Sequence, residues 1–202
     1  MNDADRQRLF TASCIALTVT AMTFAIRAGI LTQLSETFDL NDQQLGWINA
    51  MAFLGFPVAT MLGGLLYNAL GAKRLIVLAF AGHLIGLALT IGASGFWTLL
   101  ISSFCIGFAN GSVEAGCNPV VADLYEVNKT TMLNRFHVWF PGGIVVGALA
   151  SLGVTRLGFG WQTQIAIMFV PTIIYGILIL RQRFPERHHI KLSPDTIYVG
   201  VA

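Results

Sequence analysis

Six long stretches of mostly apolar residues, separated by short polar segments, account for most of the chain. They cover Leu9–Leu34, Leu45–Leu66, Leu75–Ala93, Phe96–Leu124, Phe136–Leu157 and Gln162–Leu180. A helix needs about 20 mostly apolar residues to cross the hydrocarbon core of a bilayer. Each stretch is about that long, so the sequence predicts an all-α membrane protein with six transmembrane helices.

The composition supports a membrane protein. Of the 202 residues, 55% are hydrophobic and only 11% are charged, whereas about a quarter of the residues of a soluble domain are charged. The net charge of +2 gives no basis for nucleic-acid binding. Cys14, Cys105 and Cys117 lie inside apolar stretches and have neither metal-ligand spacing nor a disulfide pattern. We therefore expect no metal and no cofactor.

Basic residues outside the predicted spans lie almost entirely on one side of the predicted membrane, and only Arg156 lies near the opposite face. They precede the first stretch, separate the second from the third and the fourth from the fifth, and follow the sixth: Arg6, Arg8, Lys73, Arg74, Lys129, Arg135, Arg181, Arg183, Arg187 and Lys191. Cytoplasmic loops are enriched in Lys and Arg. We therefore expect both termini in the cytoplasm of a multi-pass protein, most simply in a bacterial inner (plasma) membrane.

The two halves of the chain share a short pattern. Phe56-Pro57 is followed six residues later by Gly63, and Phe140-Pro141 is followed six residues later by Gly147. The offset of 84 residues relates the second stretch to the fifth. Inverted repeats of three helices are common in transporters, so the pattern predicts two three-helix units.

The junction of the second and third stretches contains a family motif. Gly64, Asn68, Gly71, Lys73 and Arg74 resemble the loop G-x-x-x-D-x-x-G-(R/K)-(R/K) of the major facilitator superfamily, with Asn in place of Asp and Ala in place of the first basic residue. That loop lies on the cytoplasmic side between the second and third helices of the family. The resemblance implies a secondary transporter that works by alternating access, with this loop as part of its gate.

The resemblance also sets an expectation for the domains. Family members usually have about twelve helices in two halves. Residues 1–187 would be one such half, and residues 188–202 a cytoplasmic tail or the start of a linker between halves. We expect either a fragment whose C-terminal six-helix half is missing or a half that pairs with a second copy.

The fourth stretch contains one acid, Glu114, with Asn110 and Asn118 four residues away on either side. On a helix these three fall along one stripe. An acid at membrane depth is expensive and is functional by default. Glu114-x-x-x-Asn118-Pro119 also resembles the fourth helix of the fucose–proton symporter branch, which implies proton coupling or sugar contact for Glu114.

That branch has an aspartate in its first helix, whereas the charged residue here is Arg27. An arginine cannot be neutralised cheaply, so Arg27 requires water, an acid or an anionic ligand, or it extends to the outer interface. Its depth differs from that of Glu114, and direct pairing is not expected. An arginine at this place also occurs in superfamily members that move organic anions.

Four further residues are secondary candidates. Asn49 in the second stretch and His137 could bind a solute, and His137 could also bind a proton. Trp139 could stack on a sugar or anchor the chain at the membrane interface. His83 is expected to face another helix.

The leading functional hypothesis is secondary active transport of a small polar solute, a sugar by proton symport. The alternatives are an organic-anion transporter that uses Arg27, an intramembrane enzyme with Glu114 and His137 as its acid–base pair, and a truncated fragment that does not transport. The sequence has no Gly-rich phosphate loop and no zinc-ligand spacing, so we expect no enzyme. The partners would be the solute, protons and the lipid bilayer.

Overall fold

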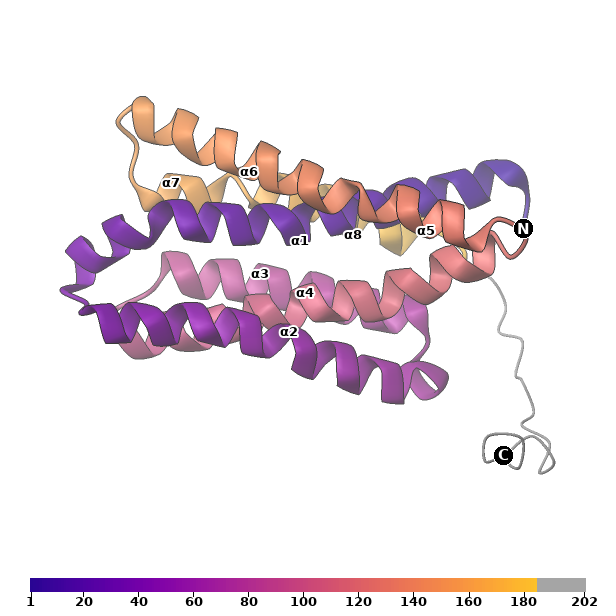
Figure 1. The fold of residues 1–202 in the computed structure, drawn as a ribbon, viewed down its shortest axis with the longest axis horizontal. Coiled ribbons are helices and arrows are strands. Elements are labelled where there is room, and N and C mark those ends of the chain that lie inside the picture. The colour runs from indigo at the N-terminus through magenta and orange to yellow at the C-terminus, as the bar shows by residue number, and fades with distance from the viewer. Residues whose placement is uncertain (185–202) are drawn as a thin grey trace.

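The computed structural model describes residues 1–184, and the predicted tail at 188–202 lies outside this range. The described chain is almost entirely helical (Figure 1). Its helices are α1 (Asp3–Phe38), α2 (Asp42–Leu70), α3 (Ala72–Ile91), α4 (Phe96–Leu124), α5 (Lys129–His137), α6 (Trp139–Arg156), α7 (Trp161–Ala166) and α8 (Phe169–Arg181).

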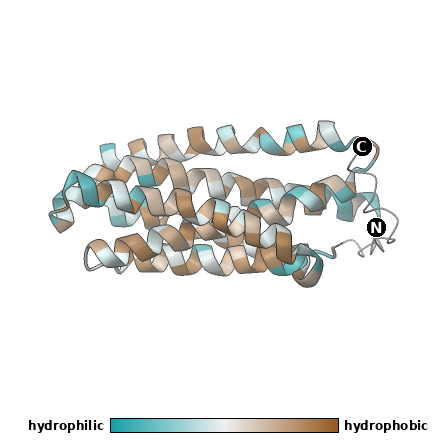
Figure 2. Cartoon of the chain, turned by 60° about the horizontal axis from the view of Figure 1, so that its bottom comes forward, coloured by the Kyte–Doolittle hydropathy of each residue, from teal (hydrophilic) through white to brown (hydrophobic). Residues whose placement is uncertain are grey.

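These helices form six candidate membrane spans by length and composition. Each of α1 to α4 is one span, α5 and α6 together are the fifth, and α7 and α8 together are the sixth. Figure 2 shows apolar residues along the middle of the bundle and polar residues concentrated at its two ends. The prediction of an all-α, multi-pass membrane protein with six spans is therefore confirmed.

Two prolines explain why the fifth and sixth spans are interrupted. A proline has no N–H, so the carbonyl four residues earlier loses its helical donor. Pro141 leaves the carbonyl of His137 without this donor, and α5 ends at that residue. Pro171 does the same to Ile167, and the break between α7 and α8 lies at Ile167 and Met168. The sequence predicted one helix for each of these two spans, with a bend at Pro141.

The helices form two layers (Figure 1). In one layer α4 packs against α2 and α3, and in the other α1 packs against α6 and α8. Contacts between α1 and α4 and between α3 and α8 join the layers. Most of the buried residues belong to α1 and α4, so these two helices form the centre of the bundle.

Glycines bring the paired helices unusually close at equivalent places. A Cβ built on Gly63 of α2 would lie 2.5 Å from Cβ of Ala115 on α4. A Cβ built on Gly147 of α6 would lie 2.9 Å from Cβ of Ala25 on α1. The two glycines are 84 residues apart and the two alanines 90.

A second pair of contacts follows the same offsets. A Cβ on Gly111 of α4 would lie 2.9 Å from Cβ of Ala59 on α2, and a Cβ on Gly143 of α6 would lie 2.7 Å from Cβ of Ala21 on α1. The α6–α1 contact thus repeats the α2–α4 contact at two places, which lie one helical turn apart. The packing matches the two three-helix units that the short sequence repeat predicted.

The neighbouring glycines of α6 provide a test of this packing. A Cβ on Gly143 would also lie 2.7 Å from the carbonyl oxygen of Thr18, whereas no atom lies within 4 Å of a Cβ on Gly142. Overpacking costs about 1–3 kcal/mol, so Gly143→Ala should lower the free energy of unfolding by that amount. Gly142→Ala should leave it unchanged or raise it by up to about 1 kcal/mol. Denaturation of both variants in detergent measures the difference, and equal effects would contradict the contact.

Candidate functional site

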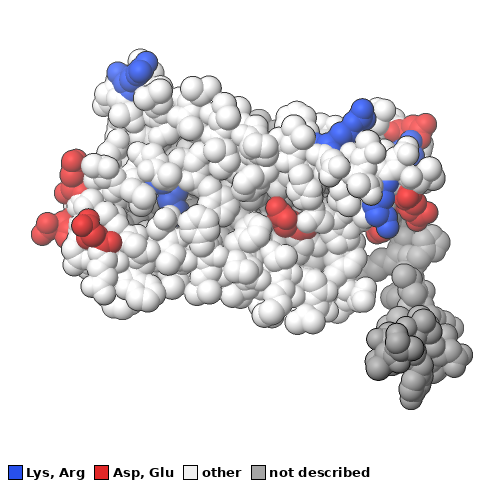
Figure 3. Space-filling view, in the orientation of Figure 1, with Lys and Arg blue, Asp and Glu red and all other residues white. Residues whose placement is uncertain are grey.

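Two charged side chains lie away from the ends of the spans. Arg27 on α1 and Glu114 on α4 are the only Asp, Glu, Lys or Arg residues in the central turns of the six spans. Figure 3 shows charged groups gathered at both ends of the bundle, with small acidic and basic patches between them on this face. A charge at this depth requires a partner or a function.

Arg27 is held inside the bundle. Its side chain is 3% exposed, and its Nη1 donates a hydrogen bond to Oγ of Ser103 on α4. Ser103 in turn donates to the carbonyl oxygen of Leu99 at 2.6 Å. Within residues 1–184 no carboxylate lies within 4.0 Å of the guanidinium. Arg27 is thus a buried cation whose described contact is a neutral hydroxyl.

Glu114 has a more open position. It is half-buried, and its Oε2 accepts a hydrogen bond of 3.2 Å from Nδ2 of Asn118, one turn along α4. Ser103 precedes it by eleven residues, a distance of about 16 Å along the helix axis. Since Arg27 bonds to Ser103, the cation and the acid lie at different depths, as the sequence predicted, and they form no ion pair.

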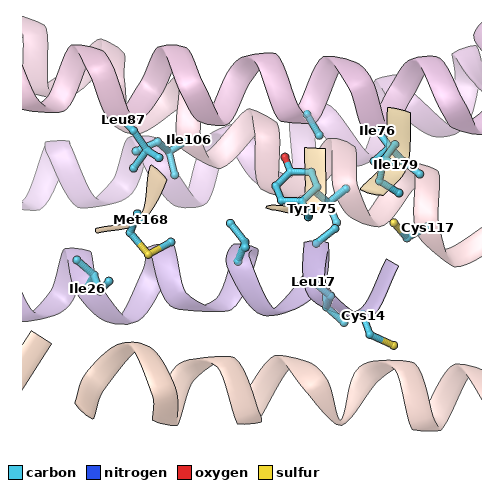
Figure 4. Packing of buried hydrophobic residues seen from close by; sticks show 14 of the residues in the cluster. Cys14, Leu17, Ile26, Ile76, Leu87, Ile106, Cys117, Met168, Tyr175 and Ile179 are labelled. Carbon is cyan, nitrogen blue, oxygen red and sulfur yellow. The ribbon is translucent and has the colours of Figure 1, made fainter. Parts of the chain in front are cut away.

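A buried hydrogen-bonded chain links four helices between these two charges. Asn110 on α4 donates from Nδ2 to Oγ1 of Thr23 on α1 at 3.0 Å. Its Oδ1 lies 2.8 Å from Nε2 of His83 on α3, and Nδ1 of His83 lies 2.7 Å from the hydroxyl of Tyr175 on α8. We call these four residues the buried tetrad. Figure 4 shows Tyr175 among the apolar side chains of the core.

The donors and acceptors of the buried tetrad match in one arrangement. The amide oxygen of Asn110 accepts, so Nε2 of His83 is the protonated nitrogen and Nδ1 accepts the hydroxyl proton of Tyr175. His83, Asn110 and Tyr175 are fully buried. Both ends of the Asn110 amide are therefore used within the protein. The three residues of the predicted polar stripe therefore do not act together. Glu114 and Asn118 bond to each other, whereas Asn110 belongs to the buried tetrad.

Sequence reasoning missed the role of Tyr175. It predicted that His83 faces another helix, and the structure confirms this. A tyrosine near the middle of an apolar stretch is a usable signal, because a buried hydroxyl usually finds a hydrogen-bond partner. The partner could not be identified beforehand, since it depends on how α3 and α8 meet.

The loop motif stabilises the neighbouring helix end. Gly71 has a φ of 81°, in a region that favours glycine. Nζ of Lys73 donates to the carbonyl oxygens of Leu180 at 3.3 Å and Gln182 at 3.2 Å, at the C-terminus of α8. A cation satisfies the last carbonyls of a helix and its dipole. The other predicted motif residues are exposed: Gly64, Asn68 and Arg74.

The remaining candidates lie apart from these groups. Asn49 is half-buried on α2, and His137 and Trp139 are exposed near the junction of α5 and α6. The ring of His137 meets the ring of Phe136 edge-on. Within residues 1–184 Glu114 bonds to Asn118 and His137 meets Phe136, so the acid–base pair of the enzyme hypothesis is not assembled.

A multi-pass helical bundle with buried polar groups between its central helices fits a membrane transporter. Comparison with known families agrees. The sequence profile described as Major Facilitator Superfamily matches residues 13–197. The chain belongs to this superfamily, and the resemblance drawn from the loop motif is confirmed. The match to the superfamily does not single out its fucose–proton symporter branch.

Curated relatives are also transporters. Myo-inositol transporter 1 of Candida albicans is 23% identical over 133 residues, which are 65% of this chain and 24% of the relative. Sphingosine-1-phosphate transporter SPNS2 of Mus musculus is 26% identical over 159 residues, 76% of this chain and 28% of the relative. The D-xylose transporter of Levilactobacillus brevis is 23% identical over 156 residues, 76% and 34% respectively. These relatives are transporters and not enzymes, in agreement with the expectation from the sequence.

Solved structures share the fold. A bacterial homologue of the human lysosomal transporter Spinster, in an inward-facing and unoccupied conformation, has a TM-score of 0.79 at 16% identity over 93% of this chain and 45% of its own. Tetrameric PepTSo2 has a TM-score of 0.72 at 19% identity over 87% of this chain and 41% of its own. The chain thus spans less than half the length of each relative and structure named here.

The buried tetrad should contribute to stability. Tyr175→Phe removes one hydroxyl and leaves a nitrogen of His83 without a partner, so we expect the free energy of unfolding to fall by about 1 kcal/mol. Tyr125→Phe, at the end of α4 and outside the tetrad, is the matched control and should change it by less than about 0.5 kcal/mol. Denaturation in detergent measures both. No loss in Tyr175→Phe would show that the hydroxyl bond adds nothing.

Proposed function

We propose that the chain forms one half of a secondary active transporter that moves a small polar solute by alternating access, with proton symport through Glu114. The observation that supports this most is the half-buried carboxyl on the central helix α4, with an amide as its hydrogen-bond partner. Such a group can be reached by a proton and is close enough to the protein interior for its charge to matter.

A sugar or a similar polyol is the solute we favour. Two relatives are named for such solutes, myo-inositol and D-xylose. The acid and Asn118 offer hydrogen-bonding groups suited to hydroxyls, and the Glu-x-x-x-Asn-Pro sequence resembles the fucose–proton symporter branch. The distribution of Lys and Arg supports cytoplasmic termini, and a bacterial inner membrane is the location we favour.

Alternating access is compatible with the packing of the bundle. The α2–α4 and α6–α1 contacts fasten the two three-helix units together through small residues, so the six-helix half can move as one body against a second half about a fixed site. The Spinster homologue named above was solved facing inward, which is one of the two states such a mechanism requires. A second six-helix half, from the same or another chain, would complete the pathway.

Arg27 supports a second candidate, transport of an organic anion. A buried guanidinium with no carboxylate within 4.0 Å in residues 1–184 provides the charge that a carboxylate or phosphate ligand needs, with a fork of donors that fits either group. One relative, SPNS2, is named for sphingosine-1-phosphate.

The acid on α4 is tested by solute-driven proton entry. The protein as its gene encodes it is reconstituted in liposomes, and internal pH is followed while sugars are added. Glu114→Gln removes the proton-binding group and should abolish proton entry. Glu126→Gln, an exposed acid after the end of α4, is the control and should behave as the parent. Proton-coupled uptake that survives Glu114→Gln would rule out Glu114 as the coupling group.

The anion candidate is tested with labelled organic acids in the same liposomes. Truncating one member of a buried charged hydrogen bond costs several kcal/mol, so Arg27→Gln should raise the apparent KM by about 30-fold or more. Arg156→Gln, which removes an exposed arginine at the far end of α6, should not change it. Sugar uptake that depends on Glu114, together with no organic-acid uptake in the parent, would reject the anion candidate.

A further inference from the structure

The amide of Asn118 is satisfied at one end only. Its Nδ2 donates to Oε2 of Glu114 at 3.2 Å. Its Oδ1 is buried and has no hydrogen-bond partner within residues 1–184. An unpartnered amide oxygen in a protein interior is costly, so this acceptor beside the carboxyl group calls for an explanation.

The chemistry of the two groups provides one. An ionised carboxylate only accepts hydrogen bonds, and the amide meets it with its N–H group. A protonated carboxyl gains an O–H donor and then needs an acceptor. Asn118 has an acceptor at the other end of the same amide. The χ2 torsion of Asn has a broad and roughly two-fold energy profile. Rotation of the Asn118 amide by a half-turn therefore places its oxygen, in place of its nitrogen, opposite Glu114.

The next residue supplies a partner for the turned amide. Pro119 has no N–H, so the carbonyl of Ala115 lacks its helical donor. This carbonyl lies one turn before Asn118 on the same helix. After a half-turn the amide nitrogen of Asn118 faces away from Glu114 and can donate to that free acceptor. The sequence Glu114-x-x-x-Asn118-Pro119 thus contains an acid, a reversible partner and a free carbonyl.

We propose that Asn118 is a positioning residue that follows the protonation state of Glu114. With the carboxylate ionised, the amide donates to it from Nδ2. When a proton from the aqueous phase binds to Glu114, the amide turns, Oδ1 accepts the new O–H bond, and Nδ2 moves to the Ala115 carbonyl. In this step an O–H bond of a hydronium ion breaks and leaves water, and an O–H bond forms on the carboxyl. This role rests on the proposed function of Glu114 as the proton-binding group.

Infrared spectroscopy can test the acceptor directly. The full chain in lipid nanodiscs is compared between acidic and alkaline buffer, and the C=O stretch of protonated Glu114 is identified as the band that Glu114→Gln abolishes. A carboxyl whose O–H group has an acceptor absorbs at lower wavenumber than one without. Asn118→Leu should therefore shift the band to higher wavenumber, and Asn118→Gln, which keeps an amide, should shift it back.

Control variants separate this role from general packing. Asn134→Ala removes an exposed amide from α5 and should leave the band in place. If Asn118→Leu does not fold, Asn118→Ala serves instead. A band that stays in place without the Asn118 amide would overturn the proposal, as would the absence of any Glu114 band in the parent. Solute-driven proton entry is measured separately, so a failure of transport with an intact band shift would reject only the proposed function.

Discussion

The close approach of α2 to α4 and of α6 to α1 is the constraint on which the rest of the bundle depends. Helices inside a bilayer gain little from burying apolar surface, so their association relies on close packing and on hydrogen bonds between helices. Glycine at Gly63 and Gly147 lets each pair of helices meet through small side chains. With α4 and α1 held in this way, their remaining faces turn toward each other and toward α3 and α8. The buried polar contacts between α1 and α4, Arg27 with Ser103 and Thr23 with Asn110, lie on those faces.

Polar groups at membrane depth find their partners in different ways at three levels along α1 and α4. Arg27 reaches a serine hydroxyl across the helix pair. The buried tetrad satisfies its donors and acceptors internally and joins both layers. Glu114 is only half-buried. A fully satisfied network favours one rigid arrangement, whereas a half-open acid can change its charge. The central helices therefore combine a fixed element with an adaptable one, about one helical turn apart on α4.

Much of this arrangement could be predicted from the sequence, because the bilayer imposes a strong length rule. The six spans, the fourth of them with its bounds Phe96–Leu124, follow from apolar length alone. The depth difference between Arg27 and Glu114 follows from helix rise. The missing N–H group of Pro141 and Pro171 does not predict the breaks before them by itself, because Pro57 and Pro119 lie inside the uninterrupted helices α2 and α4. The partners of His83 could not be predicted either, since they depend on which faces of α3, α4 and α8 meet, and apolar stretches without a marked polar face do not specify this.

Symmetry in the packing is not matched by symmetry in the chemistry. The offset of 90 residues that relates Ala25 to Ala115 also pairs Glu114 with Phe24 and Arg27 with Cys117. Each charged residue thus has an uncharged counterpart in the other repeat. Because the two repeats pack alike, the acid and the arginine are not required by the fold, and a charge that the fold does not need is costly to keep inside a membrane. Such a charge is better explained by what it binds, a proton in the case of Glu114 and an anion in the case of Arg27.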